Sequence, residues 1–434
     1  MKGTTQGRRG LALSLLLTAG FVALNLVVAR LLSARGIQPT TGLDTAIVAS
    51  LMETGSYPPT VHYPPGVPLL QFLVVGVVGL PETAMWVLRA LMMAGGLLSL
   101  AGLTRLYSST WYLPAVVVSL TLANPYFVWT GLASRDFAAS FGLMMAGLYL
   151  ILRMARRPAG GAAHLLLAAG GAVLGSLASL VRITILFEVS ALLIVLYFLY
   201  RQRRRELLLA GSVFAVFVVG FLAHNYRLMG RVLLSSETYP LVQGNHPGYL
   251  NCHPKYDVDG CFDGEIGAYL LRQGDVGELA ASDALRDLAL RYITSDPLAF
   301  IYRALVKSAW HWFNLEKIPN YTAIAEWDSS TRSLIVRSDI QIPYSLAYAL
   351  YKIVYLPLFI ASLITLVRKR RWEWAPFYLP YFVLWPIVIL TFPDTRYKMA
   401  AEVLSILPMM LFLEEAVRDW RRSRSPAGQA GAAA

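Results

Sequence analysis

Residues 11–32, LALSLLLTAGFVALNLVVARLL, form the apolar run that decides the class of this protein. The run follows a short basic segment, as the core of a signal peptide would. Its length of about 22 residues exceeds the roughly 7 to 15 residues of such a core. About 20 apolar residues in a helix cross the roughly 30 Å hydrocarbon layer of a bilayer. We therefore expect an uncleaved first membrane span.

The composition of the whole chain agrees with a membrane protein. Of its 434 residues, 56% are hydrophobic and 15% are charged, and the mean hydropathy is +0.53. A soluble domain carries about 25% charged residues. The net charge of +12 comes from short basic runs between apolar blocks. This pattern indicates membrane topology rather than a solvated basic face for nucleic acid, so no nucleic-acid partner is predicted.

Further apolar runs long enough to span the bilayer predict an all-α polytopic membrane protein. It has about ten transmembrane helices, external juxtamembrane helices and a small external helical segment. The predicted spans start near Leu11, Thr83, Trp111, Phe137, Ala162, Ile183, Leu207, Ile342, Glu373 and Tyr397. The run at 66–80, GVPLLQFLVVGVVGL, is only about 15 residues long and favours an interfacial or re-entrant helix.

The basic residues set the orientation, because cytoplasmic loops collect lysine and arginine. If the short run does not cross, all the basic runs fall on the side of the N-terminus. These are Lys2, Arg8 and Arg9, Arg105, RMARRP at 153–158, RQRRR at 201–205, RKRR at 368–371 and RDWRRSR at 418–424. Both termini are then cytoplasmic. The external segments are residues 34–66, the surroundings of Asp136 and Arg182, the long segment after Arg227, and the surroundings of Arg396.

These assignments divide the chain into four parts. We expect an N-terminal transmembrane catalytic module at 1–226 with the first external loop at 34–66. An external segment at 227–340, C-terminal transmembrane helices at 341–417 and a cytoplasmic tail at 418–434 follow. The end of the tail, SRSPAGQAGAAA, has the composition of a disordered segment.

The external segment is expected to form a small helical cap on the membrane surface. Residues 282–313 hold two amphipathic patterns that break at Asp296-Pro297, with Ser282 and Ser295 as predicted N-caps. Cys252 and Cys261 lie in the same segment on the oxidising face, which favours a disulfide. The alternatives are free thiols or a zinc site with His253 and His246, although the spacing matches no standard zinc motif.

Charged residues at the outer mouths of predicted spans are the candidate site. Side chains of this kind cost about 2.5 to 3.5 kcal/mol each at membrane depth, so they tend to be paired or functional. Asp44, Asp136, Arg182 and Arg396 fit this description. The alternatives are N-capping for the two aspartates and snorkelling to headgroups for the two arginines.

The order of short motifs along the chain resembles the membrane glycosyltransferases of the C fold. More closely it resembles the superfamily of protein O-mannosyltransferases and lipid A aminoarabinose transferases, which is similar to glycosyltransferase family 39. The motifs are LDTAIVASLMETGSYP at 43–58, HYPPGVPLL at 62–70, SRDFAASFGLMMAGLYLIL at 134–152, HNYRLMGRVLLSS at 224–236 with GNHPG at 244–248, and TRYKMAAEVL at 395–404.

The resemblance implies roles for individual residues. The family's first-loop aspartate, matched by Asp44, is the catalytic base that activates the acceptor, and Asp136 matches a second carboxylate of the same site. Arg396 and Tyr397 match the pattern that holds the lipid phosphate, and Arg182 could share this task. Further predicted substrate or loop contacts are Glu53, His62, Tyr63, Asn225, Arg227 and His246. Glu53 could also be merely solvated, and His62 is a loop histidine rather than a metal ligand in our interpretation. O-mannosyltransferases carry an Asp-Glu pair where this chain has Asp44-Thr45, which speaks against protein O-mannosylation.

The predicted function is an inverting transfer of a sugar from a polyprenyl-phosphate donor to an acceptor hydroxyl. The composition hints at a bacterium, and we expect the cytoplasmic (inner) membrane with the active site on the extracytoplasmic face. The sequence does not specify the sugar or the acceptor, which could be glycan, lipid or protein. No cofactor is assigned, and a divalent metal stays open. Two alternatives remain: a lipid-linked glycan polymerase or ligase that uses His246, His253 or His311, and a transporter of lipid or sugar without transferase chemistry.

Overall fold

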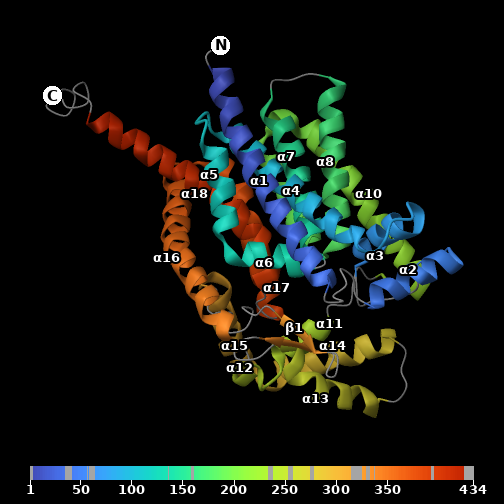
Figure 1. The fold of residues 1–434 in the computed structure, drawn as a ribbon. Coiled ribbons are helices and arrows are strands. Elements are labelled where there is room, and N and C mark those ends of the chain that lie inside the picture. Colours follow the sequence, from blue (N-terminus) through green and yellow to red (C-terminus); the bar gives the residue numbers. More distant parts are fainter. Residues whose placement is uncertain are drawn as a thin grey trace.

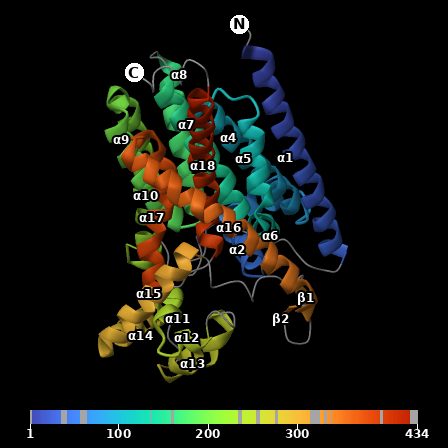
Figure 2. The ribbon, with the colours of Figure 1, turned by 90° about the vertical axis from the view of Figure 1, so that its left-hand side faces the viewer.

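The protein is a bundle of long helices with a helical cap at one end. The structure is a computed structural model that describes residues 3–34, 42–55, 57, 64–134, 136–157, 161–232, 238–252, 258–273, 278–313, 325–328, 333–336, 338–391 and 395–424. The two termini lie at the same end of the bundle, and the cap lies at the opposite end (Figures 1 and 2).

A helix occupies each of the ten segments that hydropathy singles out. They are α1 (Gly3–Ala34), α4 (Ala84–Tyr107), α5 (Leu113–Ala123), α7 (Phe137–Arg156), α8 (Ala162–Val181), α9 (Thr184–Leu199), α10 (Arg204–Met229), α16 (Ser338–Arg368), α17 (Ala375–Leu390) and α18 (Thr395–Ser423).

In the part of the chain that the structure describes, seven helices are long and apolar enough to cross a membrane. These are α1, α4, α7, α8, α10, α16 and α17, and their number makes this a multi-pass membrane protein. Helices α5 and α9 are apolar but shorter than 18 residues, and α18 does not meet the same criterion. Seven helices are therefore candidate spans, and the number of about ten spans stays a prediction.

Helix α18 runs through the middle of the bundle and is buried along residues 398–411. It continues to Ser423, so the predicted tail at 418–434 begins as helix. The remaining tail residues after 424 lie outside the described part of the chain.

Two helices are joined where hydropathy predicts one span. Helix α6 (Pro125–Ala133) follows α5 directly. Asn124 separates the two because its side chain accepts hydrogen bonds from the backbone N–H groups of Tyr126 and Phe127, at 3.0 and 3.3 Å. Pro125 occupies the first helical position, where its missing N–H costs nothing. The Asn-Pro pair therefore starts a new helix.

Small residues let the central helices approach closely. A Cβ atom on Gly142 of α7 would lie 2.4 Å from the carbonyl oxygen of Met92 in α4. A Cβ on Gly171 of α8 would lie 2.8 Å from the carbonyl oxygen of Gly147. Membrane helices associate through such small residues, because lipid provides little hydrophobic drive between them.

Short helical elements lie between α1 and α4. Helix α2 (Gly42–Thr54) is followed by α3 (Gly66–Gln71) and a π-helical segment, η1 (Phe72–Val77). Together α3 and η1 make a short apolar helix of the kind expected for an interfacial or re-entrant segment.

The cap consists of α11 (Thr238–Asn245), α12 (Tyr249–Cys252), α13 (Val258–Arg272), α14 (Glu278–Ser295) and α15 (Pro297–Phe313). The predicted break at Asp296-Pro297 is confirmed. The predicted N-caps are wrong, since Ser282 lies inside α14 and Ser295 is its last residue. Asp296 is the N-cap residue of α15, because its carboxylate accepts a hydrogen bond from the backbone N–H of Ala299 at 2.9 Å.

Helix α15 turns its basic face inward. Arg303, Lys307 and His311 are buried at spacings of four residues. The Lys307 Nζ donates to the carbonyl oxygens of Ile389 and Thr391, at 2.9 and 2.7 Å. Burial lowers the pKa of Lys307 to about 7. A neutral amine can still donate both hydrogen bonds.

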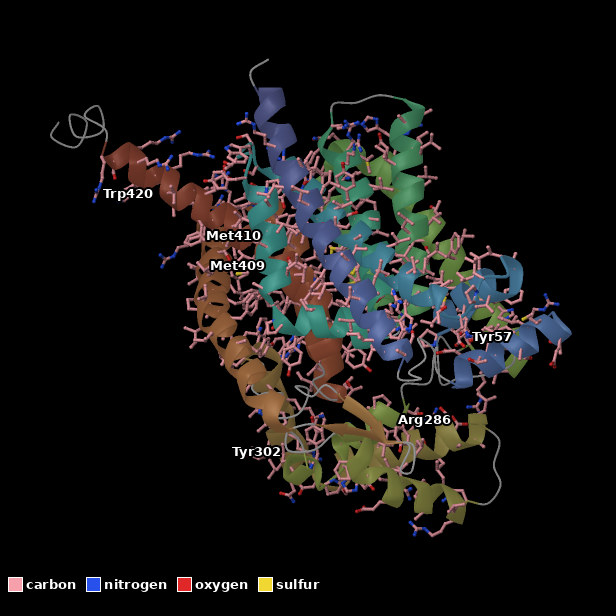
Figure 3. The ribbon with its side chains drawn as sticks, in the orientation of Figure 1. Tyr57, Arg286, Tyr302, Met409, Met410 and Trp420 are labelled. Atoms are coloured by element: carbon pink, nitrogen blue, oxygen red, sulfur yellow. The ribbon has the colours of Figure 1, made fainter. Side chains whose placement is uncertain are left out.

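The opposite face of α15 is apolar and exposed. Leu298, Ile301 and Leu305 are 79%, 52% and 64% exposed, and Tyr302 projects outward beside them (Figure 3). An exposed apolar stripe of this kind supports the prediction that the cap lies on the membrane surface.

The fold also contains a feature that the all-α prediction omits. Strands β1 (Ala325–Asp328) and β2 (Ser333–Val336) pair antiparallel just before α16. The alternation in a four-residue strand is too short to be recognised in the sequence.

Candidate active site

Asp136 and Arg182, both predicted site residues, form a part-buried ion pair at the cap end of the bundle. Asp136 directly precedes α7, and Arg182 lies between α8 and α9. The Arg182 Nε donates to Asp136 Oδ2 at 2.9 Å, and the arginine side chain is 7% exposed. The Ser134 hydroxyl donates to the other carboxylate oxygen at 2.5 Å. Asp136 makes no side-chain cap hydrogen bond to α7, so the pairing with Arg182 replaces the N-capping interpretation.

Tyr397, at the start of α18, joins this pair. The Arg182 guanidinium lies over the Tyr397 ring, 5.0 Å from its centroid. Tyr397 also packs against the hydrophobic core of the cap. Arg182 thus contacts both Asp136 and Tyr397, and its side chain is 7% exposed.

The first external loop packs against the same region. A Cβ on Gly66, the first residue of α3, would lie 2.6 Å from the Val181 Cα. Val67, Ala139 and Val181 form one buried cluster. This cluster brings α3 against the residue that precedes Arg182 and against the first turn after Asp136.

Asp44 lies in the first turn of α2 and is 1% exposed. Helix α2 packs against α3 and η1. The Thr45 hydroxyl and the Gln71 amide both reach Glu82 Oε1, at 3.5 and 3.3 Å, which ties α2 and α3 to the loop before α4. Asp44 is therefore a buried acid on the loop that folds back toward Arg182.

Other predicted site residues lie in α2 and α10, or their side chains are not described. Glu53 and Arg227 are exposed, while Asn225 is buried near the end of α10. His62 and Tyr63 lie outside the described residues. Arg396 is in the first turn of α18, and its side chain is not among those described.

His246 belongs to the core of the cap. Its Nδ1 accepts the Gly248 N–H at 3.1 Å, so a neutral ring carries its proton on Nε2, which contacts Glu265 Oε2 at 3.0 Å. The ring stacks on Phe262 with centroids 3.9 Å apart. These contacts give His246 a structural role in the cap.

His311, a candidate base in the polymerase alternative, is also committed to structure. Its Nε2 lies 3.2 Å from the Tyr381 carbonyl oxygen. Burial lowers the pKa of His311 to about 3, so the ring is neutral. His253 lies outside the described residues.

Two charged residues that sequence reasoning did not single out lie in this part of the bundle. Glu188, in α9, is 1% exposed, and its Oε2 has no hydrogen-bond partner among the described residues. It lies within electrostatic range of Arg182. Arg89, in α4, is buried with its guanidinium 5.1 Å from the Trp86 ring centroid. A charged residue inside an apolar run was the signal that could have found both.

A second buried polar cluster supports α18 two turns after Arg396. Lys352 Nζ donates to Glu402 Oε1 at 2.5 Å, and the Asn124 amide lies 3.4 Å from Glu402 Oε2. The Lys352 amine also lies 4.3 Å from the Tyr355 ring centroid. Glu402 lies within the TRYKMAAEVL motif, but the sequence gives no sign that Lys352 is its partner.

Metal and disulfide chemistry stay at the level of prediction. Among the described residues, no group of three or more histidine, cysteine, aspartate or glutamate side chains could hold a metal ion. The side chains of Cys252 and Cys261 are not among those described, so the disulfide and the zinc alternative remain predictions.

No protein-family model matches the sequence, and no curated protein matches it significantly. A solved structure, the archaeal oligosaccharyltransferase AglB from Archaeoglobus fulgidus in complex with an inhibitory peptide and a dolichol-phosphate, is similar to the chain at 12% identity and a TM-score of 0.47. The match covers 96% of this chain and 51% of that chain, so this chain spans about half the length of the archaeal protein. A likeness at this level assigns neither a substrate nor a catalytic residue.

Proposed function

We propose that the protein is an integral membrane glycosyltransferase that moves a sugar from a polyprenyl-phosphate donor to an acceptor hydroxyl. The observation that carries the proposal is the part-buried Asp136–Arg182 pair beside Tyr397. It brings together two residues that the family resemblance selects, Asp136 and Tyr397, with Arg182, a charged residue at the mouth of a predicted span. The buried Asp44 lies on the loop that packs against the same region.

Arg182 and Arg396 are proposed to hold the donor phosphate. A guanidinium presents a planar fork of donors that matches phosphate geometry. Asp136 orients Arg182 through its Nε, and in the proposed complex the guanidinium faces the donor phosphate. A cation fixed in advance stabilises the negative charge that grows on the departing phosphate.

Asp44 is proposed as the general base. Its carboxylate takes the proton of the acceptor hydroxyl while the oxygen bonds to the anomeric carbon from the face opposite the phosphate. The bond between that carbon and the phosphate oxygen breaks, and polyprenyl phosphate leaves with the electron pair. The sugar is inverted. General-base assistance of this kind contributes about 10² to 10⁴ in rate.

The orientation of the protein is part of the proposal. Arg105, Arg156, Arg371 and Arg418, from four different basic segments, line one recess at the end of the bundle away from Asp136. This grouping supports a cytoplasmic location for that end under the positive-inside rule. The active site would then lie on the extracytoplasmic face of a bacterial inner membrane.

A transfer assay on purified protein in detergent tests the proposal against its rivals. A panel of radiolabelled polyprenyl-phosphate sugars is offered with mixed membrane lipids and glycans as acceptors. We expect label to leave one donor and appear in a product of one added sugar. A ladder of lengthening lipid-linked products would favour the polymerase. A separate flux assay in proteoliposomes addresses the transporter. Label that crosses the membrane unchanged, with no turnover of any donor, would favour that alternative.

A further inference from the structure

We propose that a groove between the start of α5 and the last turns of α18 binds an anionic phospholipid. The groove lies at the end of the bundle that carries both termini, far along α18 from Tyr397. Its function is independent of the transferase proposal and does not depend on the identity of the donor.

The groove combines apolar walls with a basic end. It has a volume of about 510 Å³. Its apolar lining is Leu113 and Val116 from α5 with Met410 and Leu413 from α18. Arg418, Arg421 and Arg422 follow along the same helix and line its other end. An acyl chain fits the first surface, and a phosphate fits the second.

The single carboxylate of the groove is already occupied. Glu414 accepts hydrogen bonds from the hydroxyls of Ser108 and Thr110, both at 2.6 Å. The Arg418 Nη2 donates to it as well, at 3.0 Å. Arg421 makes no ion pair with any side chain that the structure describes. The lining of the groove holds three arginines and one glutamate, so its formal net charge is positive and suits an anion.

The neighbouring recess provides an internal contrast. It has a volume of about 660 Å³ and is lined by arginines and acids in closer balance. Arg371 is paired there with Glu415 at 2.5 Å and lies 3.7 Å from Glu373. That recess is lined by four arginines and three glutamates and shares Arg418 and Glu414 with the groove, so its formal net charge is less positive than that of the groove.

The end of α18 has the residue types of a membrane interface. This part of the helix extends sideways from the bundle, and Trp420 projects from it (Figure 3). Trp420 is 54% exposed, and Val417 and Tyr112 are 46% and 47% exposed. Tryptophan and tyrosine concentrate at the membrane interface, while nearby arginines attract anionic headgroups. A neutral lipid would not require the arginines, and a soluble anion would not require the apolar walls.

Native mass spectrometry of the full-length protein in detergent tests this site. We would titrate phosphatidylglycerol and phosphatidylcholine separately into wild type and into Arg421→Gln/Arg422→Gln. Wild type should retain phosphatidylglycerol in preference to phosphatidylcholine. Each arginine near an anionic lipid contributes binding free energy, and the loss of two should weaken phosphatidylglycerol binding about 30-fold. Both arginines are exposed, so the variant should fold normally.

A charge-matched control separates the groove from general attraction to anionic lipid. Arg201→Gln/Arg205→Gln removes two exposed arginines from the RQRRR segment and should leave phosphatidylglycerol binding unchanged. Equal losses in both double variants would overturn the proposal, as would equal binding of the two lipids by wild type. In the last experiment, soluble glycerol phosphate competes with phosphatidylglycerol for binding. If it competes as well as phosphatidylglycerol at equal concentration, the site is a simple anion site and the lipid proposal is wrong.

Discussion

Replacing Arg182 with glutamine separates its structural role from its proposed role in donor binding. In the folded protein its guanidinium makes one charge-assisted hydrogen bond to Asp136 at 2.9 Å and one ring contact with Tyr397 at 5.0 Å. A hydrogen bond to a charged group contributes about 1.5 to 3 kcal/mol, and a cation–π contact about 0.5 to 1 kcal/mol. We therefore expect Arg182→Gln to lower the free energy of unfolding by roughly 2 to 4 kcal/mol.

The effect on activity should exceed what this loss of stability explains. Removing one preorganised donor from a site of developing negative charge lowers the rate by about 10² to 10³. For Arg182→Gln we expect kcat/KM for the lipid donor to fall about 10²-fold at a temperature where the variant is fully folded. Arg182→Lys keeps the charge without the planar fork and should recover part of the loss.

Initial rates over a range of donor concentrations, measured alongside a thermal unfolding curve, give both quantities. Arg272→Gln, which removes an exposed arginine from the cap, is the charge-matched control. A folded Arg182→Gln variant whose kcat/KM stays within threefold of wild type would refute a role for Arg182 in donor binding. The ion pair with Asp136 would then be purely structural.

Three further predictions concern stability and covalent structure. Because burial lowers the pKa of Lys307 to about 7 from 10.5, the unfolded chain holds a proton above pH 7 that the folded chain has released. The unfolding midpoint should therefore rise between pH 7.5 and 9.5, and Lys307→Met should flatten this rise; parallel pH profiles would contradict it. Lys352→Met leaves Glu402 buried without its cation and should cost about 3 to 5 kcal/mol, whereas Lys352→Met/Glu402→Leu should regain most of this loss. Additive losses in that double-mutant cycle would show that the pair is not coupled. Finally, intact mass with and without reductant, after alkylation, should show no free thiol at Cys252 and Cys261 before reduction; two alkylated cysteines would favour free thiols.

The helices were predictable because they depend on local pattern. Each long apolar run became a helix, and the break at Asp296-Pro297 follows from the conformational limits that proline imposes. The start of α6 at Asn124-Pro125 uses the same chemistry, but it lies within an apolar stretch that hydropathy treats as one span. The N-cap at Asp296 was missed because Ser295 and Asp296 are both good capping residues, and only the backbone geometry decides between them.

The site was predictable in part. Family motifs selected Asp136 and Tyr397, and Arg182 was selected as a charged residue at the mouth of a predicted span. The structure adds that Asp136 pairs directly with Arg182. No pattern along the chain could pair residues that are 46 positions apart. Glu188 was missed for a related reason: it is a candidate site residue only because it lies close to Arg182 in space.

The measurement that tests the central claim most directly is the single-turnover transfer rate of Asp44→Asn beside wild type, with the donor that wild type accepts. The change removes the proposed base and keeps the size of the side chain. We predict a rate at least 10²-fold lower, with the unfolding midpoint and the donor affinity close to those of wild type. Transfer by a folded Asp44→Asn protein within threefold of the wild-type rate would contradict the assignment of Asp44 as the base, and with it the proposed mechanism.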